Sequence, residues 1–264
     1  PYGTGHINDT FKVVANQGGA TVFFTLQRLN TAIFKHPATV MGNIVQITRH
    51  LAAGLAAEGA PDATRRALQV VPTRAGESFL RAADGSCWRL YVFINQAFTV
   101  DQVERVGDAR TAAFAFGRFQ RLLADLPGGG SLAETIPGFH DTRGRYAAFK
   151  RAVAADPLGR AAEVRPEIDF ALAREPLADI LPPLVASGEI PVRATHNDTK
   201  VNNVLLDERT REGICVIDLD TCMPGLALYD FGDMVRAGTN TAAEDTTQPE
   251  TVASRADVFA ALAD

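Results

Sequence analysis

The densest group of residues that could do chemistry is Thr-His-Asn-Asp-Thr-Lys-Val-Asn-Asn at positions 195–203. It contains a carboxylate at Asp198, a cation at Lys200 and an amide at Asn203, and the second of two apolar runs that follow closes on Asp218. Phosphoryl transfer from a nucleotide needs a carboxylate beside the acceptor hydroxyl, oxygen ligands for magnesium, and a cation near the transferred group. These residue types and spacings therefore predict a phosphoryl-transfer site.

The role of each side chain follows from its chemistry. Asp198 is predicted to accept the proton of the acceptor hydroxyl, and Lys200 to offset charge near the transferred phosphoryl group. Asn203 and Asp218 carry the hard oxygen donors that magnesium prefers, so ATP and magnesium are the predicted cofactors. His196 is expected to hydrogen-bond the loop backbone, because an alcohol that attacks phosphate needs little base strength.

Three further acidic residues need separate interpretation. The tripeptide at 230–232 reads Asp-Phe-Gly, a metal-binding motif of protein kinases, but it lies where a helix is predicted to begin. We therefore assign the metal to Asp218 and expect Asp230 and Asp233 to cap a helix or to brace the loop before it. Asp220 is expected on the same face of an extended segment as Asp218, either as another metal ligand or as support for the first.

A second polar segment precedes the first predicted strand. Gly3 and Gly5 permit a close backbone approach to phosphates, and His6 and Asn8 would point the same way from an extended segment. The segment fits a loop over a nucleotide, which makes the two glycines cofactor-binding candidates. A hairpin turn with polar side chains fits the same spacing.

Hydrophobic periods divide the chain into a strand-rich part and a helix-rich part. Strands are predicted at 11–14, 21–29, 68–71, 88–94, 204–206 and 213–217. Helices are predicted at 38–57, from 103 onward, and at 145–155, 161–173, 177–185 and 227–236. The predicted class is α+β, with an N-terminal antiparallel sheet lobe carrying one main helix at 1–95 and a mostly helical lobe at 96–264. Phe93, at the end of a strand that runs into the connector at 95–101, is a further cofactor-binding candidate, although plain core fits that strand equally well.

Composition narrows the class of protein. With 26 basic against 31 acidic residues the formal net charge is −5, which argues against a general nucleic-acid binder. Cys87, Cys215 and Cys222 lack metal-ligand spacing and are expected to be buried packing residues in a reducing compartment. No apolar run approaches the about 18 residues of a membrane span, and the start lacks a signal-peptide pattern. We therefore expect a soluble, cytoplasmic protein without a membrane partner, of unspecified oligomeric state.

Five motifs are spread over nearly the whole chain. They are Pro-Tyr-Gly-Thr-Gly-His-Ile-Asn at 1–8, Leu-Gln-Arg-Leu-Asn-Thr-Ala-Ile-Phe at 26–34, Phe-His-Asp-Thr at 139–142, Thr-His-Asn-Asp-Thr-Lys at 195–200, and Ile-Asp-Leu-Asp-Thr-Cys-Met-Pro-Gly at 217–225. Together they resemble the N-acetylhexosamine 1-kinase family of the aminoglycoside phosphotransferase and choline kinase superfamily, which has a bilobal protein-kinase-like fold.

The resemblance implies an ATP- and magnesium-dependent kinase that phosphorylates the anomeric hydroxyl of N-acetylglucosamine or N-acetylgalactosamine. It implies Asp198 as the base, Asn203 and Asp218 as magnesium ligands, and His6 and Asn8 at the sugar. Similar sugar kinases continue for several helices beyond the equivalent of residue 264. We therefore expect this chain to be the ordered part of a longer one whose remainder completes the acceptor site.

The chain departs from many kinases at the ATP phosphates. Those kinases pair a lysine on the third strand with a glutamate on a helix. Here the comparable strand reads Phe-Thr-Leu-Gln-Arg at 24–28 and the helix reads Met-Gly-Asn at 41–43. The sequence therefore predicts that other residues hold the ATP phosphates.

Two other functions fit the same residues. One is phosphotransfer to an aminoglycoside or an amino alcohol, since cationic acceptors favour an acidic cleft. The other is a pseudokinase that binds nucleotide or sugar without turnover, which the Gln-Arg pair at 27–28 supports. The complete set of Asp198, Asn203 and Asp218 favours an enzyme, because a non-catalytic fold has little structural need for it.

Overall fold

The computed structural model describes residues 7–127, 132–243 and 245–264. The chain forms two compact units, one of residues 1–135 with 193–264 and the other of residues 136–192. All the predicted catalytic and metal-binding residues belong to the first unit. The predicted boundary between lobes at residue 95 stays a prediction.

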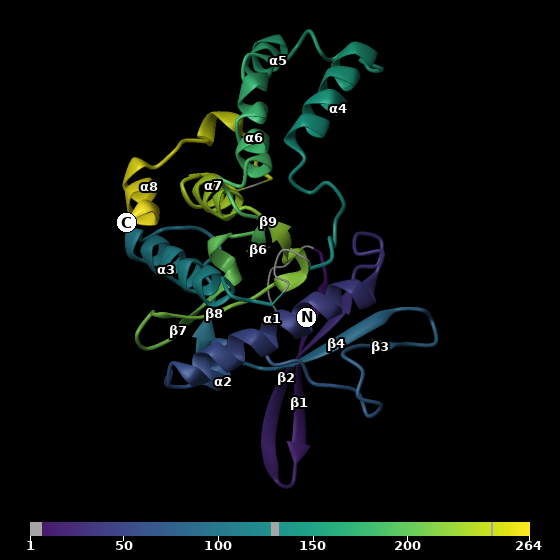
Figure 1. Cartoon of the computed structure of the whole chain (residues 1–264), viewed down its shortest axis with the longest axis vertical. Coiled ribbons are helices and arrows are strands. Elements are labelled where there is room, and N and C mark those ends of the chain that lie inside the picture. Colours follow the sequence, from purple (N-terminus) through teal and green to yellow (C-terminus); the bar gives the residue numbers. More distant parts are fainter. Residues whose placement is uncertain (1–6, 128–131, 244) are drawn as a thin grey trace. The chain divides into compact units, whose positions relative to one another are not determined.

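The first unit begins with a four-stranded antiparallel sheet in the order β1-β2-β4-β3 (Figure 1). Its strands are β1 (Asp9–Gln17), β2 (Ala20–Leu29), β3 (Leu80–Arg81) and β4 (Cys87–Val92). A two-residue turn at Gly18 and Gly19 joins β1 to β2, and both glycines have positive φ angles of 62° and 89°. This left-handed backbone suits a tight hairpin between twisted strands and favours glycine.

The long helix α1 (Pro37–Ala57) begins and ends where its sequence signals lie. Pro37 occupies the first turn, where its missing N–H costs nothing. Gly59 follows the last turn with a φ of 63°, and the amide of Ala60 donates to the carbonyl of Leu55, the pattern of a Schellman C-cap. The buried face of α1 carries apolar residues at helical spacing, among them Val40, Met41, Ile44, Ile47, Leu51 and Leu55.

The rest of the first unit contains helices and two small sheets. Its elements are α2 (Ala63–Arg66), β5 (Ala97–Phe98), α3 (Val106–Leu122), β6 (Arg193–Thr195), η3 (Val201–Asn203), β7 (Val204–Asp207), β8 (Gly213–Val216), η4 (Leu219–Thr221), β9 (Met223–Gly225), α7 (Ala227–Gly238), η5 (Pro249–Thr251) and α8 (Ala256–Ala263). The strands pair antiparallel as β5-β7-β8 and β6-β9. In α3 and at its end, Ala112, Phe116, Phe119 and Leu123 form a buried apolar stripe at helical spacing.

The second unit consists of α4 (Thr142–Ala155), α5 (Arg165–Leu172), the 3-10 turn η2 (Glu175–Asp179) and α6 (Leu181–Ala186). The carboxylate of Asp141 caps α4 by accepting from the amide of Gly144 at 2.9 Å. The hydroxyl of Tyr146 donates to the carbonyl of Ala171 at 3.0 Å and so connects α4 with the end of α5.

The α+β class with an N-terminal antiparallel sheet is confirmed, while several predicted elements differ in extent, three of them for a clear physical reason. Residues 68–71 form only one isolated bridge, from Val70 to Tyr91, because Pro72 then removes the next backbone donor. The helix predicted from 161 begins at Arg165, since Pro166 is favoured only in a first turn. The helix predicted at 177–185 is divided into η2 and α6, with consecutive prolines at 182–183 in the first turn of α6.

All three cysteines are buried free thiols, as predicted. Burial raises the pKa of Cys215 to about 12, and burial followed by nearby carboxylates raises the pKa of Cys222 well above its usual value. In the described ranges, no helix combines the length and the apolar character needed to span a lipid bilayer.

The α3 stripe generates a stability prediction. Phe116 is 1% exposed, whereas Phe114 on the same helix is 75% exposed. Phe116→Ala should lower the free energy of unfolding by about 3–5 kcal/mol, because it removes buried surface and leaves a cavity. Phe114→Ala is the matched control and should change it by less than about 0.5 kcal/mol. Chemical denaturation of both variants tests this, and equal losses would show that the stripe is not core.

Candidate active site

The 195–203 loop connects β6 to η3 and turns sharply at Asn197, whose φ is 66°. Asparagine adopts this left-handed backbone more readily than most residues. Its amide group is held on both sides, since the hydroxyl of Thr195 donates to Oδ1 at 3.0 Å and Nδ2 donates to the carbonyl of Thr221 at 2.9 Å. A Cβ on Gly225, opposite on β9, would collide with Thr195 Oγ1, so this position requires glycine.

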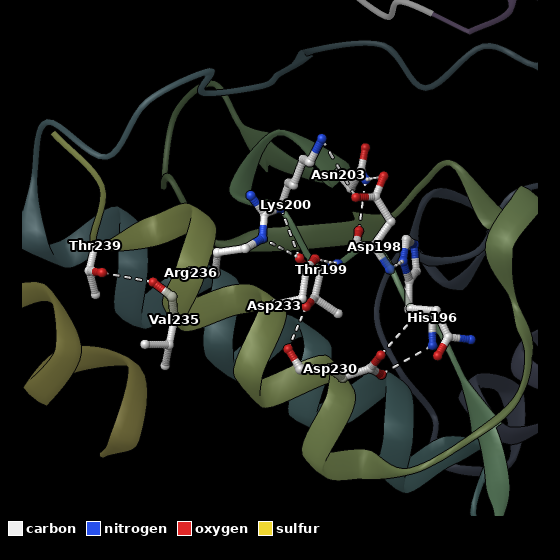
Figure 2. A network of polar contacts seen from close by, with 11 residues as sticks. His196, Asp198, Thr199, Lys200, Asn203, Asp230, Asp233, Val235, Arg236 and Thr239 are labelled. Atoms are coloured by element: carbon white, nitrogen blue, oxygen red, sulfur yellow. Dashed lines mark hydrogen bonds and ion pairs between the residues drawn. The ribbon is translucent and has the colours of Figure 1, made fainter. Parts of the chain in front are cut away.

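Asp230 braces this loop from α7 (Figure 2). Its fully buried carboxylate accepts from the backbone amides of His196 at 3.1 Å and Asn197 at 2.7 Å, and from Gln120 Nε2 at 2.8 Å. The hydroxyl of Thr199 donates to the backbone carbonyl of Asp230 at 2.5 Å. The interpretation that the Asp-Phe-Gly tripeptide braces the loop is confirmed, and it does so by hydrogen bonding rather than as the helix N-cap, which is Leu226.

Asp233 holds the loop one turn further along α7. Its Oδ2 accepts from the backbone amide of Thr199 at 2.8 Å, and its Oδ1 accepts from Arg236 Nε at 3.0 Å. The two residues that flank Asp198, namely Asn197 and Thr199, are therefore both fixed by carboxylates from α7. This leaves the Asp198 side chain at a defined place on the loop.

His196 has the structural role that the sequence predicted. Its ring is fully buried, with ring centroids 5.3 Å from Phe116 and 5.8 Å from Phe119 in edge-on contacts. Nε2 lies 2.9 Å from the carbonyl of Ile217, and Nδ1 accepts from the amide of Asp198 at 3.3 Å. One neutral tautomer satisfies both bonds, with the proton on Nε2. The histidine thus connects the loop to the segment that carries Asp218.

Asp198 presents a partly exposed carboxylate beside two predicted partners. Asn203 Nδ2 donates to its Oδ2 at 3.1 Å and to its backbone carbonyl at 2.9 Å. Lys200 Nζ lies 3.8 Å from its Oδ1, and the Asp198 and Lys200 side chains are 27% and 30% exposed. A carboxylate that is oriented and yet open to solvent can meet an acceptor hydroxyl.

The hairpin of β7 and β8 brings Asn203 and Asp218 to the same end. Val204 pairs with Val216, and the amide of Ile217 donates to the carbonyl of Asn203 at 2.9 Å. The sequence placed Asp218 at the end of a strand, which was wrong, since β8 ends at Val216 and Asp218 has a left-handed φ of 57°. Aspartate tolerates this backbone better than the apolar residues before it.

Burial, and then the neighbouring carboxylate of Asp220, raise the pKa of Asp218 to about 6, although the charge of Arg89 opposes the rise. A bound divalent cation would favour the ionised form of such a carboxylate. Because Asn203 Nδ2 is engaged by Asp198, its amide oxygen is the atom left to meet a cation.

The donor set fits magnesium. Among the residues that the structure describes, no group of three or more His, Cys, Asp or Glu side chains could hold a metal. Magnesium does not need one, because it is usually bound by one or two protein oxygens together with phosphates and water. Asn203 and Asp218 would provide those oxygens.

Asp220 differs from its predicted setting. Residues 219–221 form the 3-10 turn η4 rather than an extended segment. Both carboxylate oxygens bind the guanidinium of Arg89, and Asn8 Nδ2 donates to Oδ2 at 2.6 Å. Burial would by itself lower the pKa of Arg89, but the charge of Asp220 raises it above its usual value. Two roles were predicted for Asp220, a metal ligand or a support for Asp218. These contacts favour the support of Asp218.

The remaining predicted site residues have different outcomes. Gly3, Gly5 and His6 lie outside the described residues. Asn8 is described, and its Oδ1 accepts from the amide of Asn30 at 2.9 Å in addition to its bond with Asp220.

Phe93 is half-buried, its amide donates to the carbonyl of Phe23, and Lys12 Nζ lies 4.1 Å from its ring centroid. Nucleotide binding by Phe93 stays a prediction.

A cavity of about 470 Å³ adjoins the 195–203 loop. Its polar lining consists of Asp101, Gln102, Lys200, Asn202, Arg236, Asn240 and Asp245. Asn202 Oδ1 is buried and has no hydrogen-bond partner in the described part of the chain.

Sequence reasoning did not single out Asn202, Arg236 or Arg89. An arginine inside the apolar run at 88–94 was a visible signal for Arg89.

A loop carboxylate flanked by a lysine and an amide, with another carboxylate at the end of the next hairpin, is the arrangement of kinase-like phosphotransferases. The chain belongs to the phosphotransferase enzyme family, whose model matches residues 1–261.

Solved structures share this fold at low sequence identity. An aminoglycoside phosphotransferase from Alicyclobacillus acidocaldarius is 15% identical with a TM-score of 0.56, over 87% of this chain and 67% of that one. An amicoumacin kinase in complex with AMP-PNP, Ca²⁺ and Ami is 11% identical with a TM-score of 0.56, over 97% of this chain and 68% of that one. A macrolide 2'-phosphotransferase from Brachybacterium faecium is 11% identical with a TM-score of 0.52, over 97% of this chain and 75% of that one.

The bracing role of Asp230 can be tested by Asp230→Asn. The change removes the charge and turns one acceptor oxygen into a donor that faces N–H groups. The free energy of unfolding should fall by about 1–3 kcal/mol, and hydrogen exchange at the His196 and Asn197 amides should become faster. Asp169→Asn is the control, because that carboxylate is 56% exposed in a surface ion pair and should matter by less than about 1 kcal/mol. Unchanged exchange at the two amides would contradict the bracing role.

Proposed function

We propose that the protein is an ATP-dependent kinase that transfers the γ-phosphoryl group of ATP to the anomeric hydroxyl of an N-acetylhexosamine. The observation that carries this proposal is the Asp198 carboxylate, partly exposed, with Asn203 Nδ2 at 3.1 Å and Lys200 Nζ at 3.8 Å. Asp218 follows at the end of the adjoining hairpin. This group contains the base, the cation and the oxygen donors that phosphoryl transfer requires.

In the proposed reaction the acceptor oxygen attacks the γ-phosphorus, the bond from that phosphorus to the β–γ bridging oxygen breaks, and ADP leaves. Asp198 orients the acceptor hydroxyl and takes its proton on a carboxylate oxygen, while the bond from Asn203 keeps that carboxylate in one orientation. Lys200 offsets negative charge near the transferred group. Asn203 and Asp218 would hold Mg²⁺, which when bound neutralises phosphate charge.

The choice of a sugar acceptor rests on the motif at 1–8 and its resemblance to N-acetylhexosamine 1-kinases. The end of that motif contacts the turn beside Asp218, through the bond from Asn8 to Asp220. The solved amicoumacin kinase with AMP-PNP and Ca²⁺ supports the use of a nucleotide with a divalent metal.

The catalytic role of Asp198 predicts the effect of Asp198→Asn, which removes the charge and nearly preserves the shape. We expect kcat to fall by at least about 10²-fold, because proton transfer and positioning are each worth about that much or more. The melting temperature should barely move, since the carboxylate is partly exposed. Asp125→Asn, whose carboxylate is 87% exposed, is the control and should leave both quantities unchanged. Wild-type activity in Asp198→Asn would refute the assignment.

The acceptor can be identified with ATP and Mg²⁺ across a panel of N-acetylglucosamine, N-acetylgalactosamine, glucose, choline and an aminoglycoside. Phosphorus NMR should detect a sugar 1-phosphate from an N-acetylhexosamine in preference to the other products, with a reaction lacking acceptor as the background for ATP hydrolysis. A sugar 6-phosphate, or efficient product formation only with choline or the aminoglycoside, would overturn the sugar proposal. Binding of ATP and sugar without any turnover would favour the pseudokinase.

A further inference from the structure

Arg89 is a charged side chain in an apolar setting. It lies on the inward face of β4 together with the buried Cys87 and Tyr91, and its side chain is 1% exposed. Met41 of α1 covers it, with Sδ 3.9 Å from Nη1. A guanidinium at such a place is stable only when a carboxylate and further acceptors compensate for its lost hydration.

That compensation comes from Asp220 and Gln27. Nη1 and Nη2 of Arg89 donate to the two carboxylate oxygens of Asp220, the second at 3.0 Å, and Nε donates to Gln27 Oε1 at 2.9 Å. A two-pronged contact between a planar guanidinium and a planar carboxylate fixes orientation as well as distance. The ion pair therefore determines how the Asp220 side chain is turned.

The turn that carries Asp220 is held at further points. The hydroxyl of Thr135 donates to the carbonyl of Asp220 at 3.0 Å, and Asn43 Nδ2 on α1 donates to the carbonyl of Cys222 at 2.9 Å. Asp218 is the first residue of this turn, and the described contacts hold the turn from its other end. The position of Asp218 thus depends on contacts made two to four residues later as well as on the bonds of Ile217 before it.

The register of the sheet relates this arginine to the missing strand lysine. Gln27 on β2 is the direct partner of Arg89 on β4. The cation absent from the β2 position is therefore present on the neighbouring strand. Its donors are directed at the Asp220 carboxylate and at Gln27.

We propose that Arg89 is a positioning residue, which acts through Asp220 to orient the turn that presents Asp218 to the divalent metal of the nucleotide. The proposal rests on the proposed function insofar as Asp218 is a metal ligand there. It makes Asp220 a support and not a ligand, because both of its oxygens are engaged by Arg89.

The test measures Mn²⁺ binding by electron paramagnetic resonance in the presence of a nonhydrolysable ATP analogue, together with the melting temperature. The variants are Arg89→Lys, Arg89→Met, Asp220→Leu and the double variant Arg89→Met with Asp220→Leu. Arg28→Met is the matched control, because Arg28 forms an exposed ion pair with Asp9 on the same sheet.

Arg89→Met and Asp220→Leu should each weaken Mn²⁺ binding by about 10–100-fold and lower the melting temperature by roughly 10 °C, because each leaves a buried charge unpaired. The double variant should regain most of the melting temperature, since no unpaired charge remains, while Mn²⁺ binding stays weak. Arg89→Lys keeps the positive charge but loses the planar guanidinium that contacts both oxygens of Asp220. It should also bind Mn²⁺ at least about tenfold more weakly. Arg28→Met should change neither quantity.

Two results would overturn the proposal. If the double variant recovers both stability and Mn²⁺ affinity, the pair only fills space. If Asp220→Leu loses affinity while Arg89→Lys and Arg89→Met retain it, Asp220 is itself a ligand. The proposed function is tested separately by turnover of the wild-type protein. Absence of turnover there would refute the kinase assignment and leave the binding and melting comparisons informative.

Discussion

The buried carboxylate of Asp230 is the constraint on which the site geometry depends. It accepts hydrogen bonds from three N–H groups, two of them from the backbone of consecutive loop residues, and Asp230 is fully buried. An unpaired charge at this depth would be costly, so the loop and α7 are stable only together. Asp198 lies at a fixed place because the amide before it and the amide after it are both bound to carboxylates of α7.

The two segments that carry the predicted catalytic and metal-binding residues are held largely by different parts of the chain. The 195–203 loop is fixed from α7, whereas the 218–222 turn is fixed from β4 and α1 through Arg89 and Asn43. They meet at Ile217, whose amide donates to Asn203 and whose carbonyl contacts the ring of His196. Direct bonds also join the loop to the turn, since the carbonyl of Thr221 accepts from Asn197 Nδ2 and its hydroxyl donates to the carbonyl of His196. The N-terminal sheet contributes to the geometry of the turn without supplying any of the predicted metal donors.

Local signals in the sequence were sufficient for the class of fold and for the grouping of three predicted site residues on one loop. A proline and a glycine bound α1, and the spacing of Asp198, Lys200 and Asn203 brought them together as expected. The backbone at 218–221 was mispredicted, because aspartates are compatible with both an extended strand and a tight turn. The pairing of Arg89 with Asp220 joins residues far apart in the chain, and no local pattern encodes which carboxylate a buried arginine will meet.

The burial of all three cysteines has a practical consequence for spectroscopy. Cys87 lies in β4, Cys215 in β8 and Cys222 just after η4, and none offers an accessible thiolate to an alkylating reagent in the folded protein. A cysteine introduced on an exposed face, such as the outward side of α3 at Phe114, would therefore react alone. Fluorophores or spin labels can be attached at chosen sites without first removing the native thiols, so the packing around Cys222, at the end of the 218–222 turn, stays intact.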